Sequence, residues 1–247
     1  MFFSAAILHW FGSPFLSARG EGEPTCGDEI VHPGDLIVDG NTTLLIENCT
    51  FTVTGIVKVR DNATLIVRNA ELNVSINTAA GMVILENDGT LIMEEAGLNL
   101  NYDVKPSIYR LIICDVDIRD TATLDVRKSR ISSKLGQIHF RISQHSRLIL
   151  NASTSENAID AYDDSEISTD ESPIYSIDLR DNASCVVKNT DIRYFSGSGQ
   201  YIASFYNSTI GGVEFVFGSS SKVLMEGRLQ GFHRYWNTYS NLTVEGI

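Results

Sequence analysis

The residues best suited to chemistry form an acidic cluster in the second half of the chain. Asp160, Asp163, Asp164 and Glu166 lie within one short polar segment. Clustered carboxylates supply the oxygen ligands that Ca²⁺ prefers, at about six to eight per ion. The spacing matches no calcium-loop motif, so a calcium site and a solvated loop both stay open, and the solvated loop is the default. Calcium is the only cofactor that the sequence suggests.

The tripeptide Asn189-Thr190-Asp191 is a candidate catalytic motif. It resembles the N-T-D motif of polygalacturonases, whose aspartate acts with a following Asp-Asp pair, a G-H-G and an R-I-K. Here the one Asp-Asp pair, Asp163-Asp164, precedes the tripeptide, and neither G-H-G nor R-I-K occurs. The paired carboxylates that glycoside hydrolysis requires are therefore not established, and no catalytic residue is predicted.

A third group combines histidine and arginine. His139 and His145 flank a segment that contains Arg141 and Arg147. This predicts a small basic face, which could bind an anionic sugar or serve a lyase. With no acidic cluster expected in register beside it, a plain polar outer face is the favoured interpretation.

A repeat, clearest at residues 57–74, must position these side chains. This stretch alternates apolar and polar residues in three short runs, separated by D-N-A-T and N-A-E turns. Alternation with a period of two predicts β-strands with one apolar face, whereas a helix needs apolar spacings of three and four. One such unit cannot bury its own face, so copies must stack on it.

The same register recurs along the chain. With Leu65 as the anchor, the inward partners lie eight and six residues before it and two and seven after it. Apolar residues fill most of these positions around further anchors: Leu44, Leu91, Leu124, Leu148, Ile167, Cys185, Val223 and Val244. Short strands of one orientation, stacked at a repeating period, predict parallel sheets along a solenoid.

The spacing from Cys185 to Val223 is long enough for an extra loop or an unrecognised coil. Aromatic residues gather there, and the extra loop would carry Tyr194 to Tyr206. Aromatic rings suit sugar contacts and protein interfaces. A thickened core with a packed loop is nevertheless the favoured interpretation.

Turn chemistry supports the repeat. Asn, Asp, Gly, Ser and Thr precede the anchors, and these residues tolerate or stabilise turn backbone. Asn48, Asn69 and Asn189 each stand four residues after an anchor. Stacked asparagines at one corner are expected to form a side-chain ladder, which is a structural role.

We therefore expect an all-β protein, a single right-handed parallel β-helix of about eight or nine coils. Residues 1–20 are predicted to be a signal peptide, 21–35 an N-terminal cap segment and 36–247 the β-helix. The C-G-D motif at 26–28 and the D-N-A-T-L repeats resemble secreted, pectin-lyase-like β-helix surface proteins of archaea and bacteria. The resemblance implies a fold but no single activity, because that superfamily includes lyases, hydrolases, adhesins and structural rods.

Two features predict export. An apolar stretch from Met1 to Leu16 precedes small residues, as in a secretory signal peptide, and no later stretch is long enough for a transmembrane anchor. N-x-S/T sequons predict N-glycosylation, although D-N-A-T turns also create sequons as a by-product. The sequon asparagines are Asn41, Asn48, Asn62, Asn73, Asn151, Asn182, Asn207 and Asn241.

Export also favours disulfide bonds. Cys26 precedes the first coil and Cys49 stands at its outer corner, so a Cys26–Cys49 bond is expected. Cys114 and Cys185 are separated by about three coils, or roughly 14 Å. That distance exceeds the limit of about 7 Å between bonded Cα atoms, so both are expected to be buried thiols.

The formal net charge of −12, with 31 acidic and 19 basic residues, argues against binding to nucleic acid or an anionic membrane surface.

The leading hypothesis is a non-enzymatic extracellular or cell-surface module: a spacer, envelope component or adhesin. Its expected partners are cell-surface proteins or polysaccharide. Because no cap follows Val244, we expect a fragment of a longer protein, or self-assembly through an open C-terminal coil. The alternative is a polysaccharide-binding or polysaccharide-cleaving β-helix.

Overall fold

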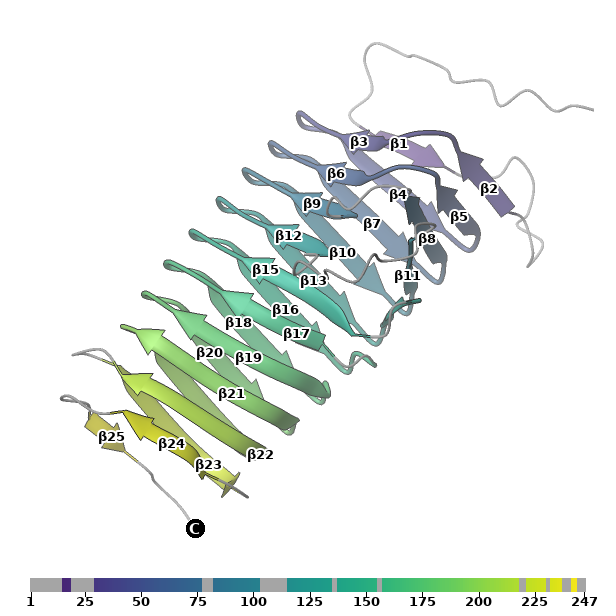
Figure 1. Cartoon of the computed structure of the whole chain (residues 1–247). Coiled ribbons are helices and arrows are strands. Elements are labelled where there is room, and N and C mark those ends of the chain that lie inside the picture. Colours follow the sequence, from purple (N-terminus) through teal and green to yellow (C-terminus); the bar gives the residue numbers. More distant parts are fainter. Residues whose placement is uncertain are drawn as a thin grey trace, which may run out of the picture.

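The protein is a parallel β-solenoid of about 8 turns (Figure 1). The computed structural model describes residues 15–18, 29–76, 82–102, 115–134, 137–154, 157–217, 221–229, 232–236 and 241–243, and these form strands and turns without a helix. Cys26, Cys114, the C-G-D motif and Val244 lie outside the described residues. The predicted all-β solenoid is confirmed.

Each coil visits up to three faces, numbered here in chain order. The first face contains β3 (Leu36–Val38), β6 (Val57–Val59), β9 (Val83–Leu85), β12 (Val116–Ile118), β15 (Ile138–Ile142), β17 (Asn157–Ala161), β19 (Ile174–Arg180), β21 (Asp191–Gly199) and β24 (Phe232–Trp236). The second contains β1 (Phe15–Ala18), β4 (Thr43–Glu47), β7 (Thr64–Arg68), β10 (Thr90–Glu94), β13 (Thr123–Arg127), β16 (Arg147–Asn151), β18 (Glu166–Asp170), β20 (Ser184–Lys188), β22 (Ile202–Phe217), β23 (Lys222–Leu229) and β25 (Asn241–Thr243).

The third face changes along the rod. In the N-terminal half it is a separate sheet of β2 (Glu29–His32), β5 (Thr50–Val53), β8 (Glu71–Ile76), β11 (Gly97–Tyr102) and β14 (Arg130–Ser133). An isolated bridge between Arg130 and Thr154 ends that sheet. Beyond it, β19 and β21 begin on the third side, and β22 runs from the second face across the third side to the first face, where it pairs with β21 and β24. Stacked residues are 21 positions apart for Asp39 and Arg60 but 18 for Asn189 and Asn207, so the later coils are shorter.

The predicted register is observed from Leu44 to Val223. The second-face strands pair Leu44 with Leu65, Leu65 with Leu91 and so on through Ile167 to Cys185. These anchors are all buried, together with their inward partners. The core is thus one continuous column of apolar side chains, which is what stacking of identical amphipathic strands produces.

Between Cys185 and Val223 the structure contains a further coil, which is the second of the two alternatives that the spacing left open, rather than an extra loop. Its anchor is Ala203, which pairs with Cys185 on one side and Val223 on the other. Tyr201 is 1% exposed and packs edge-on against Phe195, with ring centroids 6.2 Å apart. A Cβ on Gly197 would lie 2.5 Å from the Tyr201 ring, so glycine there makes the space for this ring.

The anchor predicted at the C-terminal end is displaced. Val223 pairs with Leu242, two positions before the predicted Val244. At the other end, two strands extend the stack before residue 36. β2, inside the segment expected to be a cap, pairs Ile30 with Phe51. β1, inside the predicted signal peptide, pairs Leu16 with Leu44, so removal of residues 1–20 would leave the edge of β4 without this neighbour.

The coils with anchors from Leu44 to Ala203 turn at residues with left-handed backbone. One column lies four positions before the anchors: Gly40, Asp61, Asn87, Asp120, Gln144, Asp163, Asp181 and Gly199. The other lies four positions after them: Asn48, Asn69, Glu95, Lys128, Ala152, Glu171, Asn189 and Asn207. Asparagine tolerates this conformation best among residues with a Cβ, but the repeat imposes it on Glu, Lys and Ala as well.

The predicted asparagine ladder forms in the C-terminal half. The Asn207 amide donates to Asn189 Oδ1 at 2.7 Å, and the Asn189 amide donates to Asp170 Oδ1 at 2.8 Å. Among the described residues, Asn48 and Asn69 form no such bond, although they occupy equivalent corners. The conformation is therefore common to the corner, and the side-chain bonds are local.

A hydroxyl ladder lies just inside this corner. Ser172 Oγ donates to the Asp170 carbonyl at 2.9 Å and accepts the Ser153 N–H at 3.1 Å. Thr190 Oγ1 donates to the Lys188 carbonyl at 2.7 Å and accepts the Ser172 N–H at 3.2 Å. Both hydroxyls thus satisfy a backbone N–H freed by the left-handed corner. The column contains Ser129, Ser153, Ser172, Thr190 and Ser208, of which Ser153 Oγ makes no hydrogen bond to the described residues.

Replacing Thr190 by Val tests this ladder. The change keeps the volume but leaves the buried Ser172 N–H without an acceptor, so the free energy of unfolding should fall by about 1–3 kcal/mol. Urea unfolding followed by circular dichroism measures it. Thr123→Val on β13, partly exposed and outside the ladder, is the matched control and should change stability by less than about 0.5 kcal/mol. Equal losses in both variants would contradict the ladder.

Candidate functional site

A group of polar side chains crosses the outer side of the first face. We call it the Asp160 patch, and it contains His139, Arg141, Asp160, Tyr162, Asp178 and Arg180. The strands β15, β17 and β19 pair in register, which places Arg141, Asp160 and Asp178 in one row. The row continues to Ser196 on β21. Two carboxylates therefore lie one strand spacing apart, about 4.8 Å, with a guanidinium beyond.

Asp178 is firmly held in the patch. Its carboxylate accepts hydrogen bonds from Arg180 Nε at 2.8 Å and from Ser196 Oγ at 2.8 Å. A second Arg180 nitrogen lies 2.7 Å from the same carboxylate oxygen, so two guanidinium nitrogens contact Asp178 Oδ2. Charge-assisted hydrogen bonds of this kind are stronger than those between neutral groups.

Asp160 differs from its neighbour. It is partly buried, and its carboxylate accepts no hydrogen bond from the part of the chain that the structure describes. The pKa of the Asp160 carboxyl is raised, first because burial disfavours the charged form and second because of the adjacent Asp178 charge. His139, Arg180 and Arg141 oppose this rise. Asp160 is the group in the patch most ready to accept a proton or a ligand donor.

Tyr162 and Arg180 close one side of the patch. The Arg180 guanidinium lies 5.2 Å from the centroid of the Tyr162 ring, a cation–π contact. The pKa of the Tyr162 hydroxyl is raised by burial and by the Asp160 charge, so this phenol is neutral at physiological pH. On the other side, the buried Asp115 carboxylate accepts the backbone N–H of His139 at 2.8 Å.

The structure divides the predicted basic face. His139 and Arg141 belong to the patch, whereas Arg147 lies on β16 of the second face and pairs with Glu166 at 2.8 Å. His145 stands in the turn between these faces. The expectation of no acidic cluster in register beside Arg141 is wrong, because Asp160 and Asp178 continue its row. Sequence reasoning missed Tyr162, Asp178 and Arg180, which aligning the repeats column by column could have found.

The four calcium candidates do not converge. Asp160 is in the patch, and Asp163 occupies a left-handed turn, where its carboxylate accepts the Gln144 N–H at 3.2 Å. Asp164 lies 3.6 Å from His145, and Glu166 pairs with Arg147 on the second face. Within the described ranges no group of three or more His, Cys, Asp or Glu residues could hold a metal ion. The calcium hypothesis gains no support from this arrangement.

The N-T-D tripeptide has a structural role. Asn189 turns the corner with a φ of 47°, and Thr190 is buried in the hydroxyl ladder. Asn189 and Asp191 are exposed, and Asp191 lies on the third side of the coil. The motif therefore follows from the repeat, which supports the interpretation preferred from the sequence.

The predicted glycosylation sites fall into two structural groups. Asn41, Asn62 and Asn182 share one exposed turn column, three positions before their anchors, and Asn48 and Asn151 are also exposed. By contrast, the Asn73 amide donates to Thr52 Oγ1 at 3.3 Å, and the Asn207 amide belongs to the corner ladder. For Asn241 the structure describes only its place in β25.

The two cysteines that the structure describes differ in setting. Cys49 is partly buried against the core at the predicted corner, while its expected partner Cys26 lies outside the described residues, so that bond stays a prediction. Cys185 is a free thiol, 1% exposed, at its anchor position. Burial raises the pKa of the Cys185 thiol to about 12, so it is protonated and unreactive at neutral pH.

Comparisons with protein families, curated proteins and solved structures find no match to this chain. The described residues include no helix long and apolar enough to cross a membrane. Function must therefore be argued from the faces of the solenoid themselves.

Substitution of Asp160 tests the electrostatics of the patch. A raised pKa means that the folded chain binds this proton more tightly than the unfolded chain, where an Asp pKa is about 3.9. Stability from this group is therefore gained as pH falls through the folded pKa toward about 3.9, and lost as pH rises. Asp160→Asn should raise the free energy of unfolding at neutral pH, and the gain should shrink in acid.

Urea unfolding at about pH 7 and about pH 4 measures this difference. Asp181→Asn, an exposed turn residue, is the matched control for removing one negative charge. A loss of stability in Asp160→Asn at neutral pH would show that the Arg141 and Arg180 charges outweigh burial.

Proposed function

We propose that this chain is a non-enzymatic, exported β-solenoid module that acts as a glycosylated spacer, envelope component or adhesin of a cell surface. One observation carries the proposal: three sequon asparagines, Asn41, Asn62 and Asn182, stand in a single exposed turn column. The side-chain amides of these three make no hydrogen bond to the described residues. Modification there would decorate one edge of the rod without disturbing a coil.

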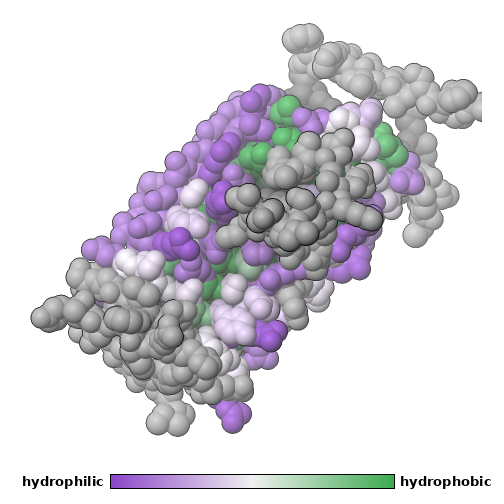
Figure 2. Space-filling model, viewed as in Figure 1, coloured by the Kyte–Doolittle hydropathy of each residue, from purple (hydrophilic) through white to green (hydrophobic). Residues whose placement is uncertain are grey.

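The character of the surface supports the same proposal. On the face shown in Figure 2, hydrophilic residues cover most of the described surface, and hydrophobic residues form only small areas. Charged columns run along the rod with alternating signs, as in the ion pairs Arg60–Asp39 at 2.9 Å and Arg68–Glu94 at 3.0 Å. Such a surface suits a spacer that stays hydrated and presents its faces to cell-surface proteins or polysaccharide.

Site-by-site mass spectrometry of the full chain, secreted from a glycosylating host, tests this proposal. Asn41, Asn62 and Asn182 should be occupied, because their turns are open and their amides have no competing partner. The same chain retained in the cytosol of that host is the control and should carry no glycan. A secreted chain that is bare at every sequon, or a chain that is not secreted, would remove the basis of the proposal.

A second candidate function, polysaccharide binding or cleavage, is favoured by the Asp160 patch. The patch combines a partly buried carboxylate, two guanidinium groups and a tyrosine on the outer side of one sheet. Clefts with perturbed carboxylates and nearby cations are common at functional sites. The pair Asp160 and Asp178 could bind sugar hydroxyls or transfer a proton.

Incubation of the full chain with polyuronate, with and without calcium, tests this candidate. If it is correct, new reducing or unsaturated ends should appear, and Asp160→Asn should reduce their rate at least tenfold. Asp181→Asn is the matched control. If no new ends form and the polymer is not retained on immobilised protein, the non-enzymatic proposal stands and this candidate fails.

A further inference from the structure

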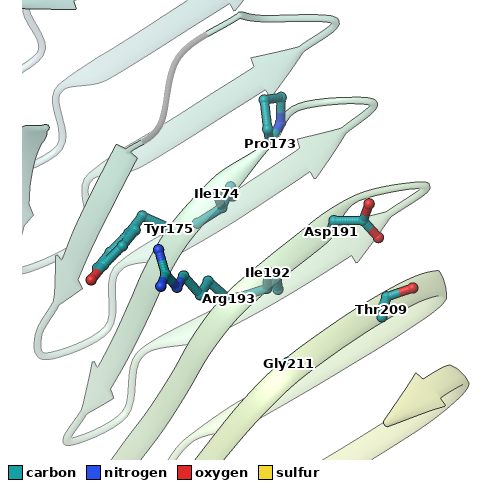
Figure 3. A pocket seen from close by; sticks show the side chains of 8 residues that line it. All are labelled: Pro173, Ile174, Tyr175, Asp191, Ile192, Arg193, Thr209 and Gly211. Carbon is teal, nitrogen blue, oxygen red and sulfur yellow. The ribbon is translucent and has the colours of Figure 1, made fainter. Parts of the chain in front are cut away.

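A surface depression on the third side of the later coils is a separate feature (Figure 3). It encloses about 420 Å³ and lies over β19, β21 and β22, apart from the row that carries Asp160. Its lining residues are Pro173, Ile174, Tyr175, Asp191, Ile192, Arg193, Thr209 and Gly211. The two isoleucines point into the core, so the floor between the outward side chains is mainly backbone.

Arg193 is the central side chain of the depression. Its guanidinium lies 5.3 Å from the ring centroid of Tyr175 and 5.5 Å from that of Tyr194. The two rings meet edge to face, with centroids 5.4 Å apart. Contact with both rings holds the guanidinium in place while its edge can still donate hydrogen bonds.

The charge of Arg193 has no carboxylate partner among the described residues. Most other described arginines do, namely Arg60, Arg68, Arg119, Arg127, Arg130, Arg147 and Arg180. In a chain with a net charge of −12, a fixed arginine that pairs only with aromatic rings leaves its donors for an external anion.

The rest of the depression is shaped for a ring with hydroxyl groups. Tyr175 lines the depression and is partly exposed, and Tyr194, 44% exposed, lies beside it. A Cβ on Gly211 would lie 3.0 Å from the Arg193 carbonyl oxygen. A larger residue at this position would therefore occupy part of the depression. Asp191 and Thr209 lie at the opposite end from the Arg193 guanidinium (Figure 3). Aromatic surface with a few placed polar groups is typical of small-ligand sites.

We propose that this depression binds a sugar residue that carries an anionic group, carboxylate or sulfate. The anion pairs with the Arg193 guanidinium, the sugar ring lies against Tyr175, and ring hydroxyls donate to Asp191 and Thr209. The site goes beyond the function proposed above, because it requires neither export nor glycosylation of this chain. It also differs in position from the Asp160 patch.

Calorimetric titration of the full chain tests the site, with a glucuronate oligosaccharide, a sulfated glucose oligosaccharide and a neutral glucose oligosaccharide as probes. At least one anionic probe should bind at least tenfold more tightly than the neutral one, and the two anionic probes separate carboxylate from sulfate. Arg193→Gln should weaken that binding at least tenfold. Arg147→Gln, on the second face, is the matched control and should leave binding unchanged.

Two further variants make the test specific. Gly211→Val should fill the floor and reduce binding. Tyr175→Ala, at a partly exposed position, should also reduce binding and tests the site if the valine variant fails to fold. Asp160→Asn should leave binding unchanged. The proposal is overturned if neutral and anionic sugars bind equally, if Arg193→Gln binds like the parent chain, or if only an acidic peptide probe binds.

Discussion

Each coil of this solenoid must bring the chain back to its starting point, displaced by one strand spacing of about 4.8 Å. Left-handed residues on either side of the second face make this return possible. For a residue with a Cβ this conformation costs roughly 1–2 kcal/mol, and it recurs in successive coils. Hydrogen bonds between coils offset the cost, as when the Gln144 N–H donates to Asp163 and the Ser172 N–H donates to Thr190.

Because successive coils are in register, one position in the repeat becomes a row along the rod. The third side illustrates this. In the N-terminal half one row is a ladder of amides and hydroxyls, in which Asn99 donates to Asn73 at 2.9 Å and Ser132 to Asn99 at 2.6 Å. In the C-terminal half, after the separate third sheet has ended, the third side carries Tyr175 and Arg193 instead. The third side therefore carries side chains that hydrogen-bond to one another in the N-terminal half, and an arginine whose donors are available to a ligand in the C-terminal half.

The same stacking places like charges together. Asp160 and Asp178 are neighbours only because their strands pair in register, and burial of Asp160 adds to the cost of their repulsion. Arg180 neutralises one carboxylate directly, and Arg141 lies beside the other in the row. Residues that look catalytic in the sequence, such as Thr190, instead belong to the corner ladder. In this solenoid the position of a residue within the repeat indicates its role better than the local sequence motif does.

Alternation around Leu65 and its copies determined the fold class and nearly all of the core, because a period of two with one apolar face has few ways to be buried. It left open whether a coil or a loop lies between Cys185 and Val223, since the anchor Ala203 is small and Gly197 occupies one of the inward positions. The candidate sites were decided by tertiary structure. Register between strands 18 or so residues apart brought Asp178 beside Asp160 and Tyr175 beside Arg193, and no local pattern encodes such contacts.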